Sequence, residues 1–357
     1  MVMVASSASV GTILPEFAAV VQLILGARIV KRKWLLLPVV LIAGVLVFNA
    51  SWRVPMPEGD GMKLIAHRGV HQTFGREGLE NDTCTAERID PPRHDYLENT
   101  IDSMEAAFTA GADIVELDVH PTTDGQFAVM HDWTVDCRTE GTGETRGHSM
   151  AELKTLDIGY GYTADGGATY PFRGKFSGQM PELKEVFAAL PGKEFLVNFK
   201  SREAREGDML AALLTENPAW RPAVWGAYGG DEPTLRAAEL IDGLHIWSRR
   251  DLVDCLVQYE LLGWLGIVPE ACKNTQVMIP INIAPFLWGW PNLLLARLKD
   301  AGSDVILLGP YGAGDPGTAG IDDIVTLEQV PGDFSGYIWT NRIEVIGPAL
   351  GRGIWTD

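Results

Sequence analysis

Short apolar segments alternate with helix-like segments along most of this chain, and this alternation restricts the possible folds more than any other feature of the sequence. Nine segments are predicted as strands, at residues 62–66, 114–118, 126–130, 195–199, 223–227, 244–247, 277–283, 304–308 and 337–339. Helical patterns separate most of them, at residues 98–110, 181–190, 202–215, 233–240, 251–262 and 292–300. Strands that alternate with helices pack as a parallel sheet, so we predict an α/β fold.

A (β/α)8 barrel needs eight parallel strands, so one of the nine predicted segments is expected to be an additional strand or a loop. No G-x-G-x-x-G sequence follows the first strand, which removes the main reason to expect a dinucleotide-binding fold. The positions of polar residues support the barrel. Barrel enzymes place their sites at the carboxyl ends of the strands. At or near these ends of the predicted strands lie His67, Glu116, Asp118, His131 and Lys200.

Residues 114–132, IVELDVHPTTDGQFAVMHD, contain the densest group of candidate catalytic side chains. Glu116 and Asp118 alternate with apolar residues, so both carboxylates are expected on the same side of a strand. Asp124-Gly125 is a strong turn signal, and the strand that follows brings His131 back toward the carboxylates. Two carboxylates beside a histidine are suited to binding a cation and transferring protons.

Residues 34–50, WLLLPVVLIAGVLVFNA, form an apolar segment at the low end of the length that spans a bilayer. Lys31-Arg32-Lys33 precedes it, so we predict a transmembrane anchor with the remainder of the chain outside the cytoplasm. A cleaved signal peptide, and hence a secreted domain, is the alternative, although Phe48 breaks the small-residue pattern of a cleavage site. Residues 1–33 stay open between a weak second span, an interfacial helix and an extension ahead of the true start.

The remaining chain divides into a Pro- and Gly-rich linker at residues 51–61 and a barrel domain at residues 62–357. Residues 70–97 are polar and irregular, and we expect this insertion to lie over the mouth of the barrel. The formal net charge is −18, from 29 Lys and Arg against 47 Asp and Glu, which argues against a nucleic-acid-binding protein.

An even number of cysteines in an exported chain indicates disulfide bonds. Of the three possible pairings, we favour Cys84–Cys137, which both lie in loops flanking the candidate site, with Cys255–Cys272, which are close in sequence. Four free buried thiols are the alternative. No Cys-x-x-Cys occurs, so a structural zinc site is not expected.

Several short motifs occur in order along the chain, and together they resemble the glycerophosphodiester phosphodiesterases. They are His67-Arg68-Gly69, Glu98-Asn99-Thr100, Glu116-x-Asp118, Thr123-Asp124-Gly125, His131-Asp132, Met180-Pro181-x-Leu183 and Trp339-Thr340-Asn341. The resemblance runs from about residue 63 to residue 350. It implies a (β/α)8 barrel that uses one divalent cation, Mg²⁺ or Ca²⁺, to hydrolyse a glycerophosphodiester to glycerol 3-phosphate and an alcohol.

The resemblance also assigns roles to individual residues. His67 and His131 match the acid and base, whose ordinary pKa suits both tasks. The residues that match phosphate or substrate contacts are Arg68, Lys200 and Trp339, and those that match metal ligands are Glu98, Glu116, Asp118 and Asn198. Glu98 has an alternative as a residue at a helix N-terminus, and Arg68 as a structural ion-pair partner. The histidines without motif support are expected on the surface or in loops, and they are His71, His94, His120, His148 and His245.

Asn198 departs from the family pattern, which has an acidic ligand at this position two residues before the lysine. A neutral amide oxygen can bind a divalent cation but adds no charge. Three alternative consequences are open: weaker metal binding, a changed metal preference or a barrel without catalysis. We expect an active enzyme with an altered ion site.

Two other functions stay open. One is the hydrolysis of intact lipid, as a lysophospholipase D or a sphingomyelinase-D-like enzyme, which the predicted anchor and the aromatic loop at residues 160–176 would suit. The other is a non-catalytic barrel that binds glycerophosphodiesters or acts as a scaffold, and it rests on Asn198 alone.

Overall fold

The computed structural model describes residues 37–80, 82–312 and 319–355 of the chain. It forms two compact units, Met1–Ala50 and Ser51–Asp357. In the first unit, residues 37–48 are helical and expose large apolar side chains such as those of Val40 and Ile42. The predictions for residues 1–33 and for the start of the anchor fall outside the described residues. Within those described, no helix combines the length and the apolar character needed to cross a membrane.

The second unit is built on one sheet whose strands run in the order β6-β5-β4-β2-β1-β9-β8-β7, with every pairing along this path parallel. The strands are β1 (Met62–His67), β2 (Ile114–Pro121), β4 (Glu194–Phe199), β5 (Val224–Gly229), β6 (His245–Ile246), β7 (Gln276–Pro280), β8 (Asp304–Leu308) and β9 (Gly336–Thr340). A ninth strand, β3 (Phe127–Val129), pairs antiparallel with β2 and is the additional strand in the prediction.

The sheet is a nearly closed barrel, as predicted. Among the described residues no strand pairing joins β6 to β7, but side chains bridge them. Gln276 Nε2 lies 3.0 Å from His245 Nδ1, and Thr275 Oγ1 donates to the carbonyl of Ile246 at 3.1 Å. These contacts hold the two ends of the sheet together.

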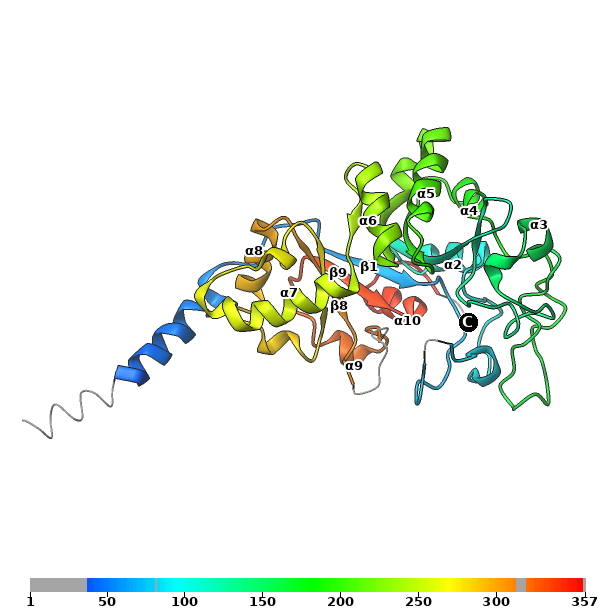
Figure 1. The fold of residues 1–357 in the computed structure, drawn as a ribbon. Helices are drawn as coiled ribbons and strands as arrows, with labels where there is room; N and C mark the ends of the chain where they lie inside the picture. The colour runs from blue at the N-terminus through cyan, green and yellow to red at the C-terminus, as the bar shows by residue number, and fades with distance from the viewer. Residues whose placement is uncertain (1–36, 81, 313–318, 356–357) are drawn as a thin grey trace, which may run out of the picture. The chain divides into compact units, whose positions relative to one another are not determined.

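Helices surround the sheet and bury its apolar outer surface (Figure 1). They are α2 (Ile101–Thr109), α3 (Met150–Leu153), α4 (Leu183–Ala189), α5 (Arg205–Glu216), α6 (Asp231–Leu240), α7 (Arg249–Leu262), α8 (Asn292–Asp300), α9 (Ile324–Leu327) and α10 (Ile343–Ala349). The helix α2 begins where the Thr100 side chain accepts a hydrogen bond from the Ser103 amide, a standard N-cap.

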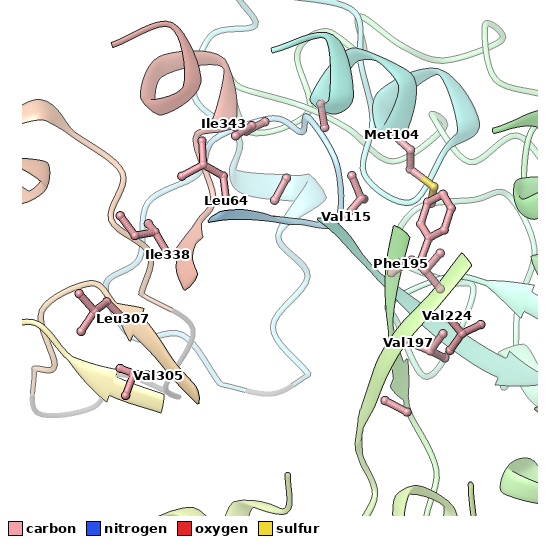
Figure 2. Packing of buried hydrophobic residues seen from close by; sticks show 14 of the residues in the cluster. Leu64, Met104, Val115, Phe195, Val197, Val224, Val305, Leu307, Ile338 and Ile343 are labelled. Atoms are coloured by element: carbon pink, nitrogen blue, oxygen red, sulfur yellow. The ribbon is translucent and has the colours of Figure 1, made fainter. Parts of the chain in front are cut away.

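The main core lies between the strands and these helices. Figure 2 shows Phe195 of β4 packed close to Met104 of α2, with Leu64 of β1 and Val115 of β2 in the same cluster. All eight residues of β2 are buried, as expected for a central strand of a parallel sheet covered on both faces.

A second core forms beside the barrel mouth and includes the aromatic loop at residues 160–176. Tyr162, Phe172 and Phe176 of that loop are buried against residues such as Met150 and Leu153 of α3. These aromatic side chains therefore stabilise the loop region, and they do not line the candidate site.

Both predicted disulfides are confirmed. Cys84 in the insertion is bonded to Cys137 in the loop after β3, and Cys255 of α7 is bonded to Cys272. The first bond ties the insertion at residues 70–97 to the loop that follows the His131-Asp132 motif.

Candidate active site

A cavity of about 350 Å³ lies at the carboxyl ends of the parallel strands. His67, Lys200 and Tyr228 line it from the ends of β1, β4 and β5, and His131 lines it from the segment after β3. The insertion contributes a large part of the wall, through His71, Phe74, Arg76, Leu79, Glu80, Thr83 and Thr85.

His67 ends β1 and is held by a residue far away in sequence. Its Nδ1 donates to Asn341 Oδ1 at 2.6 Å, and Asn341 is fixed in turn by Asp322, which accepts from its amide nitrogens. Because Nδ1 donates to an amide oxygen, Nε2 carries the lone pair in the neutral ring, and it lies 3.8 Å from Glu116 Oε2. Burial and the nearby Arg68 charge hold the pKa of His67 well below its ordinary value.

His131 has the same arrangement on the other side of the cavity. Its Nδ1 donates to Asp132 Oδ1 at 2.7 Å, which leaves Nε2 available. Arg138 donates to the other oxygen of Asp132 at 2.7 Å and so fixes the carboxylate. Burial lowers the pKa of His131, and the positive charges of Arg68 and Lys200 lower it further.

Glu116 and Asp118 lie on β2, in register with His67 of β1 and Asn198 of β4. Both carboxylates are fully buried. Tyr228 donates its hydroxyl to Glu116 Oε1 at 2.7 Å. Burial, together with the negative charge of Asp118, raises the pKa of Glu116 to about 8.

Asp118 stays ionised because its contacts outweigh its burial. Asn99 Nδ2 donates to Asp118 Oδ2 at 2.9 Å, and Asn198 Nδ2 donates to Oδ1 at 2.8 Å. Burial opposes its charge, but Lys200, whose Nζ is 3.5 Å from Oδ1, and Arg68 lower the pKa of Asp118 below the ordinary range.

Arg68 lies between two of the carboxylates. Its NH1 donates to Glu98 Oε1 at 3.1 Å, and its Nε is 3.2 Å from Asp118 Oδ2. Its backbone has φ of 61°, in the left-handed region, as does Asn99 with φ of 60°. Such conformations in residues other than glycine are uncommon and often occur at functional sites.

The donor chemistry of Glu116 and Asp118 fits a hard divalent cation, because such an ion prefers carboxylate oxygens and its charge would favour the ionised form of Glu116. The other two predicted ligands are engaged elsewhere. Glu98 is paired with both Arg68 and Arg138, and Asn198 presents its amide nitrogen to Asp118. Within the described part of the chain, no group of three or more His, Cys, Asp or Glu is arranged to hold a metal.

The structure therefore gathers all the predicted site residues at one end of the barrel. Those that line the cavity are His67, Arg68, His131, Asn198 and Lys200. The carboxylates of Glu98, Glu116 and Asp118 contact Arg68 or His67 beside it. Trp339 is buried with its ring centroid 4.8 Å from that of His67, and it is not among the residues that line the cavity.

Two histidine predictions are wrong. His120 and His245 were expected on the surface or in loops, but His120 lies on the buried strand β2 and His245 lies on β6 and is half-buried. His120 continues the buried alternation of Glu116 and Asp118 on β2, a pattern that the sequence already contained. His71 lies in a loop, as predicted, but it is buried within the folded insertion, which no local pattern indicates. The sequence also gave no signal for the contacts that Asn99, Arg138 and Tyr228 make.

A family model for the glycerophosphoryl diester phosphodiesterase family matches residues 91–212. A glycerophosphodiester phosphodiesterase of Caldanaerobacter subterraneus is 41% identical over 104 residues, which are 29% of this chain and 39% of that protein. One from Bacillus subtilis is 39% identical over 92 residues, 25% of this chain and 30% of that protein. The chain thus spans less than half the length of these two relatives.

Solved structures share the fold. The glycerophosphoryl diester phosphodiesterase domain of an uncharacterized Mycobacterium tuberculosis protein matches with a TM-score of 0.55 at 16% identity, over 82% of this chain and 100% of that chain. A putative glycerophosphoryl diester phosphodiesterase from Silicibacter pomeroyi matches with a TM-score of 0.53 at 18% identity, over 87% of this chain and 99% of that chain. At these identities the matches establish the barrel fold alone.

Proposed function

We propose that this chain, which contains a domain of the glycerophosphoryl diester phosphodiesterase family, hydrolyses glycerophosphodiesters to glycerol 3-phosphate and an alcohol. One observation carries the proposal. His67 and His131 come from different segments, line the same cavity, and each has Nδ1 bonded to a fixed oxygen so that Nε2 is available. Two positioned imidazoles are what a reaction needs when one group must lose a proton and another must gain one.

The electrostatics support the same chemistry. Both histidines are neutral at neutral pH because burial lowers the pKa of each, so either can accept a proton from a nucleophile. A bound phosphodiester anion would favour the protonated form of the other, which then donates to the leaving alkoxide.

Arg68 and Lys200 supply positive charge where the phosphate would lie. Both line the cavity, and a guanidinium can donate two parallel hydrogen bonds to phosphate oxygens. We propose that a divalent cation, Mg²⁺ or Ca²⁺, is held by Glu116 and Asp118. Glu98 and Asn198 would become further ligands by giving up their present contacts with the two arginines and with Asp118. When bound, the ion would neutralise charge on the phosphate and make it a better electrophile.

The size of the cavity suits a small diester. Its volume of about 350 Å³ is near the lower end for ligand pockets, which suits a glycerophosphodiester. Phe74, Leu79 and Trp133 line it as well, and these apolar side chains favour lysolipid hydrolysis as the second candidate. Turnover of micellar lysolipid faster than of glycerophosphocholine would select that alternative.

The direct test is release of glycerol 3-phosphate from glycerophosphocholine by the full chain. It is measured after EDTA treatment, and again with Mg²⁺, Ca²⁺ or Mn²⁺ restored. We expect turnover to disappear with EDTA and to return with one ion. If no ion supports turnover of either the glycerophosphodiester or lysolipid, the non-catalytic barrel becomes the better description.

We also propose that residues 34–50 anchor the chain in a membrane with the barrel outside the cytoplasm. Two features support this: residues 37–48 are helical with exposed apolar side chains, and the two disulfides fit an oxidising compartment. Protease added to intact cells should degrade the barrel while leaving cytoplasmic markers whole. Release of the chain from membranes by alkaline carbonate would count against the anchor.

A further inference from the structure

We propose that Nε2 of His71 forms a hydroxyl-binding subsite in the cavity, and that its ligand is a hydroxyl group of the substrate's glycerol. The inference rests on the proposed function and extends it, because it assigns recognition of the glycerol to a residue outside the shared motifs. His71 lies four positions after His67, at the start of the insertion, and lines the same cavity.

The ring of His71 faces the catalytic region. Its centroid is 6.2 Å from that of His67 with the two rings at 90°, and it stacks on Phe74 at 6.4 Å with an angle of 28°. Only 5% of the residue is exposed. The side chain is therefore confined between His67 and the insertion, and it has little freedom to turn away.

One nitrogen of the ring is satisfied and the other is not. Nδ1 lies 3.0 Å from the carbonyl oxygen of Gln72, which can only accept, so Nδ1 carries the hydrogen. In the neutral ring Nε2 is then an acceptor, and among the described residues it has no hydrogen-bond partner. A buried acceptor without a partner is disfavoured, so a site of this kind is well suited to a ligand that brings a donor.

The surrounding contacts hold this nitrogen in place. The Gln72 side chain donates to the carbonyls of His94 and Tyr96 at 2.9 and 2.8 Å. These bonds tie the start of the insertion to its end, and they fix the Gln72 carbonyl that receives the His71 proton. A site that is fixed before the ligand arrives loses little freedom on binding.

The chemistry of an acceptor restricts the ligand. A phosphate oxygen at neutral pH accepts hydrogen bonds, so it does not match Nε2 of the neutral ring, and positive charge for a phosphate is already present at Arg68 and Lys200. A hydroxyl group donates one hydrogen, and every glycerophosphodiester has hydroxyls on its glycerol. A choline head group has no donor, so the alcohol portion is not the general ligand.

The test compares two phosphate esters that differ only in hydroxyl groups, glycerol 3-phosphate and n-propyl phosphate. Calorimetry with the full-length chain gives the ratio of their affinities with EDTA and with Mg²⁺ present. We expect the unaltered chain to prefer glycerol 3-phosphate by about tenfold, as one well-placed hydrogen bond allows. His71→Phe, which keeps a flat ring without an acceptor, should bring the ratio close to one.

Two further variants separate recognition from folding. His71→Gln places an amide acceptor within reach and should keep most of the preference. His148→Phe removes a histidine that does not line the cavity and should keep all of it. Thermal unfolding of each variant shows that the compared proteins are folded.

The outcomes are distinct. Loss of the preference in His71→Phe with retention in His71→Gln supports the subsite, whether or not the chain turns over any diester. An unchanged ratio in His71→Phe, or no preference for glycerol 3-phosphate in the unaltered chain, overturns it. Failure of the proposed function appears separately, as absence of turnover with glycerophosphocholine.

Discussion

Arg138 and Asp132 form a partly buried ion pair, in which Arg138 Nε donates to Oδ2 at 2.7 Å, and Oδ1 of the same carboxylate accepts the Nδ1 proton of His131 at 2.7 Å. Arg138 also lies 3.2 Å from Glu98 and donates to Thr85 in the insertion at 2.9 Å. One guanidinium therefore connects the histidine, a candidate metal ligand and the wall of the cavity. Arg138 lies behind the site, so it acts by positioning other groups.

Replacing Arg138 with Met should both destabilise the protein and slow its reaction. Asp132 and Glu98 would each lose one ion-pair partner, and breaking a buried pair typically costs about 3–5 kcal/mol of unfolding free energy. His131 would lose its fixed orientation, and a misplaced catalytic group can reduce kcat by roughly a hundredfold. Chemical denaturation and kcat for glycerophosphocholine measure the two effects.

Arg236→Met is the matched control, because Arg236 of α6 forms exposed ion pairs with Asp208 of α5 and Glu239 of α6. It should change the unfolding free energy by less than about 1 kcal/mol. An Arg138→Met protein that is folded and has full kcat would show that Arg138 does not position His131.

The dependence of kcat/KM on pH should report the environment of the two histidines. The base must be neutral to act, and burial holds the pKa of both His67 and His131 below the ordinary value of 6.5. A lowered pKa keeps the imidazole neutral as the pH falls. Activity should therefore persist below pH 6.5, and the midpoint of the acidic limb should lie below pH 6.5. A midpoint at or above 6.5 would contradict this environment.

His131→Ala should lower kcat by about a hundredfold or more at every pH.

The sequence predicted the barrel and the principal site residues for a physical reason. Strand periodicity and local motifs depend on neighbours, so the positions of Glu116, Asp118 and His131 follow from a single continuous segment. Contacts between distant segments do not. His67 and Asn341 were both recognised in motifs, but they are 274 residues apart, and nothing local indicates that one would hold the other.

The same limit explains why the burial of His71 was not predicted. His71 lies in a loop, as expected, but its burial depends on how residues 70–97 fold across the barrel mouth. That fold depends in turn on the Cys84–Cys137 bond and on the Gln72 contacts, which connect positions up to 53 residues apart. At Glu98 the motif was visible, but its pairing with Arg138 depends on the loop after β3.

The raised pKa of Glu116 predicts how stability changes with pH when no divalent ion is bound. Its ordinary value is 4.5 and its folded value is about 8, so the folded protein binds a proton more tightly than the unfolded chain. This contribution to stability is fully present below pH 4.5 and is lost as the pH rises through 8. Glu116→Gln should therefore be more stable than the unaltered chain at pH 8, by about 1–3 kcal/mol.

The control for this prediction is to add the ion. If Glu116 binds Mg²⁺ or Ca²⁺, the ion should stabilise the unaltered chain at pH 8 and have a smaller effect on Glu116→Gln. Denaturant unfolding at pH 6 and pH 8, with and without the ion, gives the unfolding free energy of each protein under the four conditions. Equal stability of the two proteins at pH 8 without ions would show that ionisation of Glu116 does not destabilise the folded protein.

The two disulfides offer a matched comparison, because each constrains the chain but only Cys84–Cys137 holds a segment that lines the cavity. Double replacement with serine, of Cys84 and Cys137 or of Cys255 and Cys272, should lower the unfolding free energy by about 2–4 kcal/mol in either case.

The effects of the two replacements on turnover should differ. The first bond holds the insertion, which contributes His71, Phe74 and Thr85 to the cavity, whereas the second joins α7 to the segment before β7. At a temperature where both variants are folded, loss of Cys84–Cys137 should raise KM for glycerophosphocholine several-fold, because the cavity wall must be ordered as substrate binds. Loss of Cys255–Cys272 should leave KM within about twofold. If both variants raise KM equally, the change reflects lower overall stability, and the insertion then has no separate part in substrate binding.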